Sequence, residues 1–147
     1  MKGSSEGRVR AALNGMDMDV LVYKPPDDAR NWKPADFLVW WPEGQSAMVE
    51  VKESSGKFTF PIRDIRPSQL LGIRMAAAVL VPYFLVIWWP KLSSWTISNA
   101  WQVANWIGDH PDATSLDYGW LNSVAGMDCT TRDLAPILRS ALLGEVS

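Results

Sequence analysis

The sequence predicts a mixed α/β fold, in which a central mixed β-sheet of about five strands is flanked by helices. Short apolar runs rich in β-branched and aromatic residues alternate with segments of helical periodicity. Two of these runs, residues 36–41 and 46–52, are apolar on both faces, which indicates a sheet covered on each side. Hydrophobic residues make up 48% of the 147 residues and no linker divides the chain, so one domain over residues 1–147 is expected.

The helices have recognisable ends. Pro67 suits the first turn of a helix, and Ser98 is the expected N-cap of the next one. Apolar residues spaced i, i+3, i+4, i+7 and i+8 mark a final amphipathic helix, in which Pro136 requires a start near Asp133. The expected helices cover about residues 4–13, 67–80, 100–107 and 133–143.

The remaining segments divide into strands and loops. The strands are expected at residues 19–23, 36–41, 46–52, 83–89 and 94–97. The segments 53–66 and 108–128 are rich in turn-forming residues and lack clear periodicity, so they are expected to be loops. The Trp-rich residues 91–147 are expected to extend the same domain as residues 1–90.

The chain is not expected to contact a membrane. Residues 75–90 are strongly apolar, but they fall short of the roughly 20 residues that a spanning helix needs. Pro82 also divides them, which indicates a helix end followed by a buried strand. The single Cys129 cannot form an intramolecular disulfide. A reduced protein of the cytoplasm is therefore expected, in the host cytoplasm if the gene belongs to a phage.

Two acids and a base gather at one end of the predicted hairpin of residues 36–41 and 46–52. If Trp41 pairs with Gln45, paired positions sum to 86 and Asp36 lies opposite Glu50, with Cβ atoms about 5 Å apart. If Trp41 pairs with Ser46 instead, they sum to 87 and Asp36 lies opposite Val51. Strand alternation places Lys52 on the same face as Glu50. Two close carboxylates repel each other, and Mg²⁺ bound by both, together with the backbone carbonyl of Val51, would remove that cost. A salt-bridged strand end, with Asp36 capping a turn, would give the same pattern.

The order Lys33-Pro34-Ala35-Asp36 followed by Glu50-Val51-Lys52 resembles the motif of the PD-(D/E)xK nucleases. The start of the chain, residues 2–6 (KGSSE), resembles that of cellular and phage Holliday-junction resolvases, including the RecU-like and archaeal groups. Residues 66–69 (RPSQ) resemble the family's helix with an early glutamine. The resemblance covers residues 2–90 and implies a restriction-endonuclease-like core in which these residues form the catalytic part.

The resemblance also implies a role for each site residue. Asp36 and Glu50 would be the main ligands of Mg²⁺, for which Mn²⁺ could substitute, and Lys52 would be the catalytic cation. Glu6 would be an outer or water-mediated metal ligand, and Gln69 would orient the reacting groups. Glu6 at a helix start and Gln69 in a first turn are equally compatible with ordinary helix-end polarity.

Cationic residues in the first half of the chain are the expected phosphate contacts. The net charge of −2 argues weakly against nucleic-acid binding, but residues 1–74 carry +1 and residues 75–147 carry −3. Alternatively, these cations could be ordinary loop charges that face solvent and contact no phosphate. The candidates are Lys57, Arg63 and Arg66 near the flexible loop, with Lys24, Arg30 and Lys33 as weaker choices.

The resemblance favours a metal-dependent DNA endonuclease that resolves four-way junctions as a homodimer. The apolar C-terminal helix and the surplus of Trp could supply the dimer surface. The first alternative is a restriction-like or repair nuclease acting on duplex, flap or single-stranded DNA. The second is a nuclease-fold protein that binds nucleic acid or a protein partner without cutting.

Overall fold

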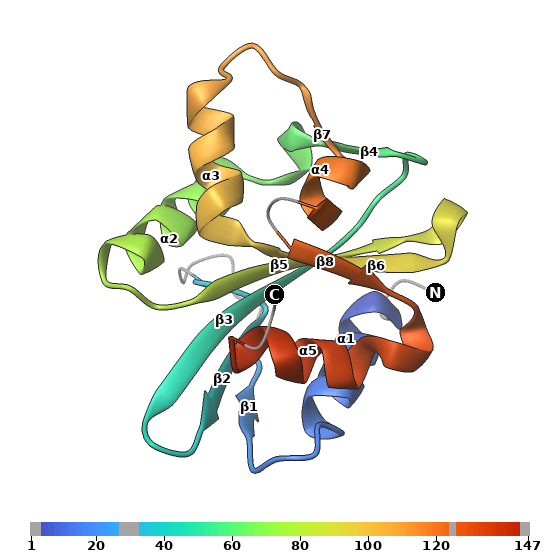
Figure 1. Ribbon diagram of the computed structural model, residues 1–147. Helices are drawn as coiled ribbons and strands as arrows, with labels where there is room; N and C mark the ends of the chain where they lie inside the picture. The colour runs from blue at the N-terminus through green and yellow to red at the C-terminus, as the bar shows by residue number, and fades with distance from the viewer. Residues whose placement is uncertain (1–3, 27–32, 124–125, 145–147) are drawn as a thin grey trace.

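A six-stranded mixed β-sheet with helices on both faces forms the centre of the protein (Figure 1). The computed structural model describes residues 4–26, 33–123 and 126–144. The strands of this sheet, in spatial order, are β1 (Leu21–Tyr23), β2 (Phe37–Trp41), β3 (Gln45–Glu53), β5 (Tyr83–Trp89), β6 (Ser94–Asn99) and β8 (Gly126–Cys129). The expected α/β class with a flanked central mixed sheet is confirmed, with six strands in place of about five.

The helices and short elements complete the chain. The helices are α1 (Ser4–Asn14), α2 (Pro67–Ala78), α3 (Ala100–Asp109), α4 (Tyr118–Ser123) and α5 (Leu134–Leu142). Three 3₁₀ turns are η1 (Ile62–Asp64), η2 (Pro90–Leu92) and η3 (Thr131–Asp133), and a separate two-stranded sheet joins β4 (Thr59–Pro61) to β7 (Ser115–Asp117).

The strand β3 is the centre of the sheet. It pairs antiparallel with β2 through a tight hairpin and parallel with β5 on its other side. A parallel pair needs a crossover, and here α2 is the helix of that crossover. Apolar residues of β3 and β5 are buried on both faces of the sheet, as expected for covered strands.

Two apolar layers cover the two faces of the sheet. One layer packs α1 and α5 against residues such as Phe37, Val39 and Val49. The other packs α2, α3 and α4 against residues such as Leu85, Ile87 and Trp89. In Figure 1, α1 and α5 lie below the sheet and α2, α3 and α4 above it. The apolar side of α5 is therefore part of the core, and the expectation that it supplies a dimer surface is wrong.

The two segments expected to be loops contain regular structure. The segment 53–66 contains β4, and the segment 108–128 contains β7, α4 and the start of β8. The strands β4 and β7 have three residues each and pair with one another, so that Phe60 lies opposite Leu116. Strands this short show no clear alternation of apolar and polar residues. Their pairing also joins segments that lie far apart in the sequence, so local patterns do not reveal it. The residues 75–90 form the end of α2 and β5, and within the described ranges no helix is long and apolar enough to cross a membrane.

Asn99, not Ser98, is the N-cap of α3. The Asn99 side chain accepts hydrogen bonds from the backbone N–H groups of Trp101 at 2.9 Å and Gln102 at 3.3 Å. The buried Ser98 hydroxyl instead donates to the Leu121 carbonyl at 3.3 Å. The helix begins at Ala100 as expected, and only the identity of its capping residue differs from the prediction. The start of α5 at Leu134, directly after the turn Thr131–Asp133, confirms the position that Pro136 requires.

Replacing Asn99 by Ala should lower the free energy of unfolding by about 1 kcal/mol, because two N–H groups at the start of α3 lose their acceptor. Chemical denaturation measures this change. Asn105→Ala is the matched control, since Asn105 is exposed in the interior of the same helix and should be neutral or slightly stabilising. Equal effects of the two substitutions would show that the cap is not stabilising.

Candidate active site

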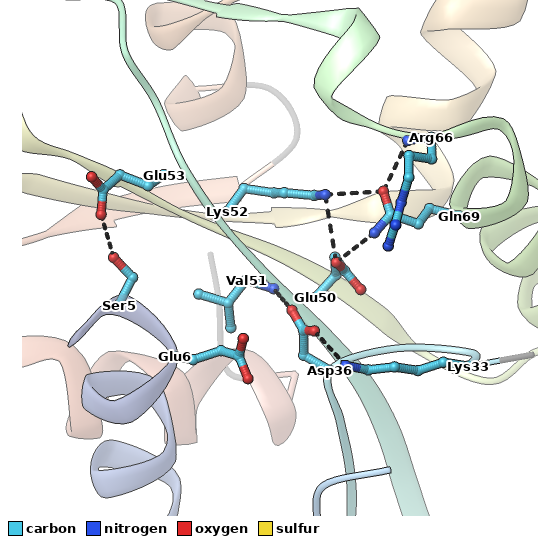
Figure 2. A pocket seen from close by; sticks show the side chains of 10 residues that line it. All are labelled: Ser5, Glu6, Lys33, Asp36, Glu50, Val51, Lys52, Glu53, Arg66 and Gln69. Carbon is cyan, nitrogen blue, oxygen red and sulfur yellow. Dashed lines mark hydrogen bonds and ion pairs between the residues drawn. The ribbon is translucent and has the colours of Figure 1, made fainter. Parts of the chain in front are cut away.

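Asp36 and Glu50 lie side by side at the end of the β2–β3 hairpin (Figure 2). Phe37 pairs with Val49 and Trp41 with Gln45, so paired positions sum to 86 and Asp36, one residue before β2, falls opposite Glu50. Of the two registers that the sequence allows, the structure has the one that sets the two carboxylates side by side. Both residues are buried, with 8% of Asp36 and 5% of Glu50 exposed. The hairpin therefore places two carboxylates together in a site largely withdrawn from solvent.

The backbone of Val51 faces the Asp36 carboxylate. Its N–H donates to Asp36 Oδ2 at 2.8 Å. The N–H groups of Met48 and Ser54 donate towards β5, to Pro82 O and Trp88 O. Because backbone groups alternate in direction along a strand, the N–H and the carbonyl of Val51 both point to the β2 side. The carbonyl expected to be a metal ligand is thus directed to the side of β3 on which Asp36 lies.

Gln69, in the first turn of α2, connects Glu50 to Lys52. Its Nε2 donates to Glu50 Oε2 at 2.8 Å, and its Oε1 accepts from Lys52 Nζ at 3.0 Å. The same Oε1 accepts from the Arg66 backbone N–H at 2.9 Å, which holds the side chain at the helix start. Lys52 Nζ also lies 3.7 Å from Glu50 Oε2. The buried amide therefore orients both the acid and the base.

The loop before β2 carries a second ammonium group to the site. Lys33 Nζ lies 3.2 Å from Asp36 Oδ1. Sequence reasoning placed Lys33 among the weaker DNA contacts and did not anticipate this pairing. Close by, the buried hydroxyl of Tyr83 donates to the Pro34 carbonyl at 2.7 Å, which ties the loop to the start of β5. Asp36 is thus held through its own side chain and through the residues before it.

Burial and the neighbouring Asp36 carboxylate raise the pKa of Glu50 from 4.5 to about 8, and Lys52 and Lys33 oppose the shift without cancelling it. The same two effects, burial and the nearby carboxylates, raise the pKa of Tyr83, so its hydroxyl stays a donor. A charged Glu50 is therefore costly without an added cation.

The acid pair lies in a cavity of about 550 Å³. The start of α1 forms one wall, where the buried Ser5 hydroxyl donates to Glu53 Oε1 at 2.7 Å and Glu6 pairs with Lys24 at 2.9 Å. Sequence reasoning missed Ser5 and Glu53, because no local signal connects a helix start to the end of a distant strand. The lining residues are Ser5, Glu6, Lys33, Asp36, Glu50, Val51, Lys52, Glu53, Arg66 and Gln69.

The expected phosphate contacts divide into two groups. Lys33 and Arg66 line the cavity, whereas Lys57 and Arg63 are exposed and do not. Lys57 Nζ lies over the ring of Phe58, 5.3 Å from its centroid. Arg30 falls outside the described residues, as do the first two residues of the KGSSE segment. The structure thus brings two of the six candidates close to the acid pair.

The donor set fits a hard divalent cation. Within residues 4–26, 33–123 and 126–144, no group of three or more His, Cys, Asp or Glu side chains forms a metal site by itself. The oxygen donors of Asp36 and Glu50, with the Val51 carbonyl, suit Mg²⁺, which keeps several waters and needs few protein ligands. Glu6 lines the same cavity but pairs with Lys24. The residues present therefore fit a cation held by two carboxylates and water.

Two other polar features have structural roles. His110, the single histidine, stacks on Trp106 with ring centroids 4.1 Å apart, and its Nδ1 lies 2.8 Å from the Trp106 carbonyl. It is the C-cap residue of α3. Trp101 Nε1 donates to the Val81 carbonyl at 3.0 Å, so this ring is a packing residue.

Comparisons with known proteins give a likeness of structure alone. No protein-family model matches the sequence, and no curated protein sequence matches it. Among solved structures, the chain is similar to the Holliday junction resolvase Hjc from the archaeal hyperthermophile Archaeoglobus fulgidus, with a TM-score of 0.46 and 7% sequence identity. The match covers 96% of this chain and 98% of that one. A likeness at this level does not assign a function to the site.

Without divalent cations, the protein should lose stability as pH rises from about 4.5 to about 8. The pKa of Glu50 is higher in the folded than in the unfolded chain, so its stabilising contribution is complete below about 4.5 and disappears above about 8. Glu50→Gln should be more stable than the wild type at pH 9 by on the order of 3 kcal/mol, and similar to it at pH 4.5. Urea denaturation in EDTA measures both.

Glu43→Gln is the matched control, because Glu43 is exposed in the β2–β3 turn and should leave the pH profile unchanged. A Glu50→Gln profile parallel to that of the wild type would contradict the buried acid pair.

Proposed function

We propose that this protein is a metal-dependent endonuclease that hydrolyses phosphodiester bonds in DNA. The observation that carries the proposal is the buried pair of Asp36 and Glu50, with Lys52 linked to it through Gln69 in an open cavity. Two close, buried carboxylates are costly for a purely structural site, and they suit cation-assisted attack on phosphorus. The resemblance of residues 33–36 and 50–52 to the PD-(D/E)xK motif supports the same conclusion.

Each residue has a role that its position supports. Asp36, Glu50 and the Val51 carbonyl would hold Mg²⁺, or Mn²⁺ in its place. When bound, the metal supplies an acidified water and stabilises charge on the phosphate. Lys52, fixed by Gln69 Oε1, presents its ammonium to the same space and can orient the attacking water or offset negative charge. Gln69 is a positioning residue because it acts through Glu50 and Lys52.

The cavity is lined by cations that can contact the backbone of a nucleic acid. Arg66 lies at the N-cap of α2, where its guanidinium and the helix start both favour a phosphate. Lys57 and Arg63 lie outside the cavity and would contact phosphates further along the strand. Glu6 would take part as an outer ligand, through water, from the wall formed by α1.

Four-way junction DNA is the substrate that the N-terminal sequence favours. The segment KGSSE resembles the start of the Holliday-junction resolvases, and the structure places its last residue, Glu6, in the cavity wall. Such an enzyme acts as a homodimer. One face of α2, continued at its C-cap, is apolar and exposed, which supports a second copy packing there. Its residues are Leu71, Met75 and Val79, with exposed fractions of 56%, 52% and 71%.

A non-catalytic nucleic-acid or partner-binding protein is the second candidate function. The net charge of −2 favours it, as does the mixture of acids and cations in the cavity. Absence of cleavage with Mg²⁺ or Mn²⁺ on branched, linear and single-stranded DNA would establish this function over the nuclease.

Asp36→Asn, Glu50→Gln and Lys52→Ala should each lower the rate of DNA cleavage by at least about 100-fold, because each removes a metal ligand or the catalytic cation. Their affinity for DNA in Ca²⁺ should fall far less. Single-turnover cleavage and fluorescence anisotropy measure the two quantities. Lys91→Ala, an exposed lysine in η2, is the matched control and should keep the wild-type rate.

A synthetic four-way junction should be cut faster than a linear duplex of the same arm sequence. Cleavage in Mg²⁺ under single-turnover conditions compares the two substrates directly. Equal or preferential cutting of the duplex would contradict the junction assignment and support a restriction-like or repair nuclease with the same chemistry.

A further inference from the structure

On the basis of the function proposed above, we propose that Lys33 and a divalent cation compete for the Asp36 carboxylate. Lys33 then becomes available to a substrate phosphate when the cation is bound. The residue would thus couple metal binding to DNA binding, a role separate from ligation and from the chemistry assigned to Lys52.

The Lys33 ammonium forms an ion pair with the carboxylate that a metal ion would need. Its Nζ lies 3.2 Å from Asp36 Oδ1, while Oδ2 of the same carboxylate accepts the Val51 N–H. Figure 2 shows the side chain reaching Asp36 from the loop before β2. With 22% of the Lys33 side chain and 11% of the Asp36 side chain exposed, the pair lies where the cavity meets solvent. The ammonium therefore balances charge at the one oxygen of Asp36 that does not accept the Val51 N–H.

An ammonium and a metal ion cannot share this oxygen at close range. The Lys33 ammonium carries three donors and no lone pair, so it cannot act as a ligand. Like charges a few ångströms apart in a partly buried site repel strongly. Lys52 is differently placed, because Gln69 Oε1 holds its Nζ at 3.0 Å while Glu50 lies further away, at 3.7 Å. Cation binding is thus expected to displace Lys33 and leave Lys52 in position.

The displaced ammonium stays close to the reaction site. Lys33 is three residues from Asp36, and its flexible four-carbon stem allows the charge to move without the backbone. Lys33 lines the cavity that a phosphodiester must enter to reach Glu50 and Lys52. Cation and phosphate would therefore strengthen each other's binding, and by linkage the two effects are equal in size.

Titration of Mn²⁺ into the DNA-free protein, followed by calorimetry, tests the competition. Lys33→Met should bind Mn²⁺ about 5-fold or more tightly than the wild type, because the competing charge is gone. Lys33→Arg keeps the charge and should resemble the wild type. Lys57→Met is the matched control, since it removes an exposed lysine outside the cavity and should leave Mn²⁺ affinity unchanged.

Affinity for a catalytically inert four-way junction, measured by anisotropy in EDTA and in Ca²⁺, tests the coupling. The wild type should gain affinity with Ca²⁺, and Lys33→Met should lose most of that gain, by about 5-fold or more. Lys57→Met should weaken binding by the same factor in both buffers. Melting curves verify that the variants fold, and Lys33→Gln replaces Lys33→Met if the latter does not.

The outcomes separate this proposal from the one on which it rests. A wild type that binds Mn²⁺ and cuts DNA, with Lys33→Met and Lys33→Gln unchanged in Mn²⁺ affinity and in the Ca²⁺ gain, overturns the competition alone. A wild type that binds no Mn²⁺ overturns both proposals. Loss of DNA affinity by Lys33→Met to the same extent in EDTA and in Ca²⁺ would make Lys33 a simple phosphate contact and also overturn the coupling.

Discussion

The burial of two like charges, Asp36 and Glu50, is the constraint on which the site depends. Neither residue is exposed by more than 8%, so each carboxylate must be compensated by the protein. The Val51 N–H and Lys33 compensate Asp36, and Gln69 and Lys52 compensate Glu50. The compensation is incomplete, as the raised pKa of Glu50 indicates. A site that remains short of positive charge after folding is suited to take up a cation.

The scaffold satisfies this constraint through the two neighbours of β3. The antiparallel pairing with β2 sets Asp36 against Glu50, and a slip of one residue would send one of them to the other face. The parallel pairing with β5 requires a crossover, and the first turn of its helix α2 brings Gln69 back to the end of β3. At the start of β5, Tyr83 holds the loop that precedes Asp36. The central strand thus determines where all three contributing segments meet.

The part of the site that follows from local rules could be predicted from the sequence. A short turn and strand alternation are enough to place Asp36, Glu50 and Lys52 on one face. The sequence predicts α1, α2, α3 and α5 to within a few residues of their ends, but α4 lies in a segment expected to be a loop. The pairs Lys33–Asp36, Lys24–Glu6 and Ser5–Glu53 could not be predicted, because they depend on loop paths and on packing between distant segments. For the same reason, Lys57 and Arg63 look suitable as phosphate contacts in the sequence but lie outside the cavity. Three-residue strands such as β4 are likewise too short to show a period.

The charge of the cavity bears on how an acidic protein could act on a polyanion. Four carboxylates and three cationic side chains line it, so the metal-free cavity carries an excess of negative charge if all are ionised. A phosphate entering that cavity would meet repulsion from Asp36 and Glu50 at short range, where solvent screens poorly. A divalent cation reverses the sign of the same space, and under the proposed function it must therefore be present before the phosphate can settle. The net charge of −2, taken alone, argues against a nucleic-acid substrate. That objection weakens once the charge of the cation is counted with that of the site.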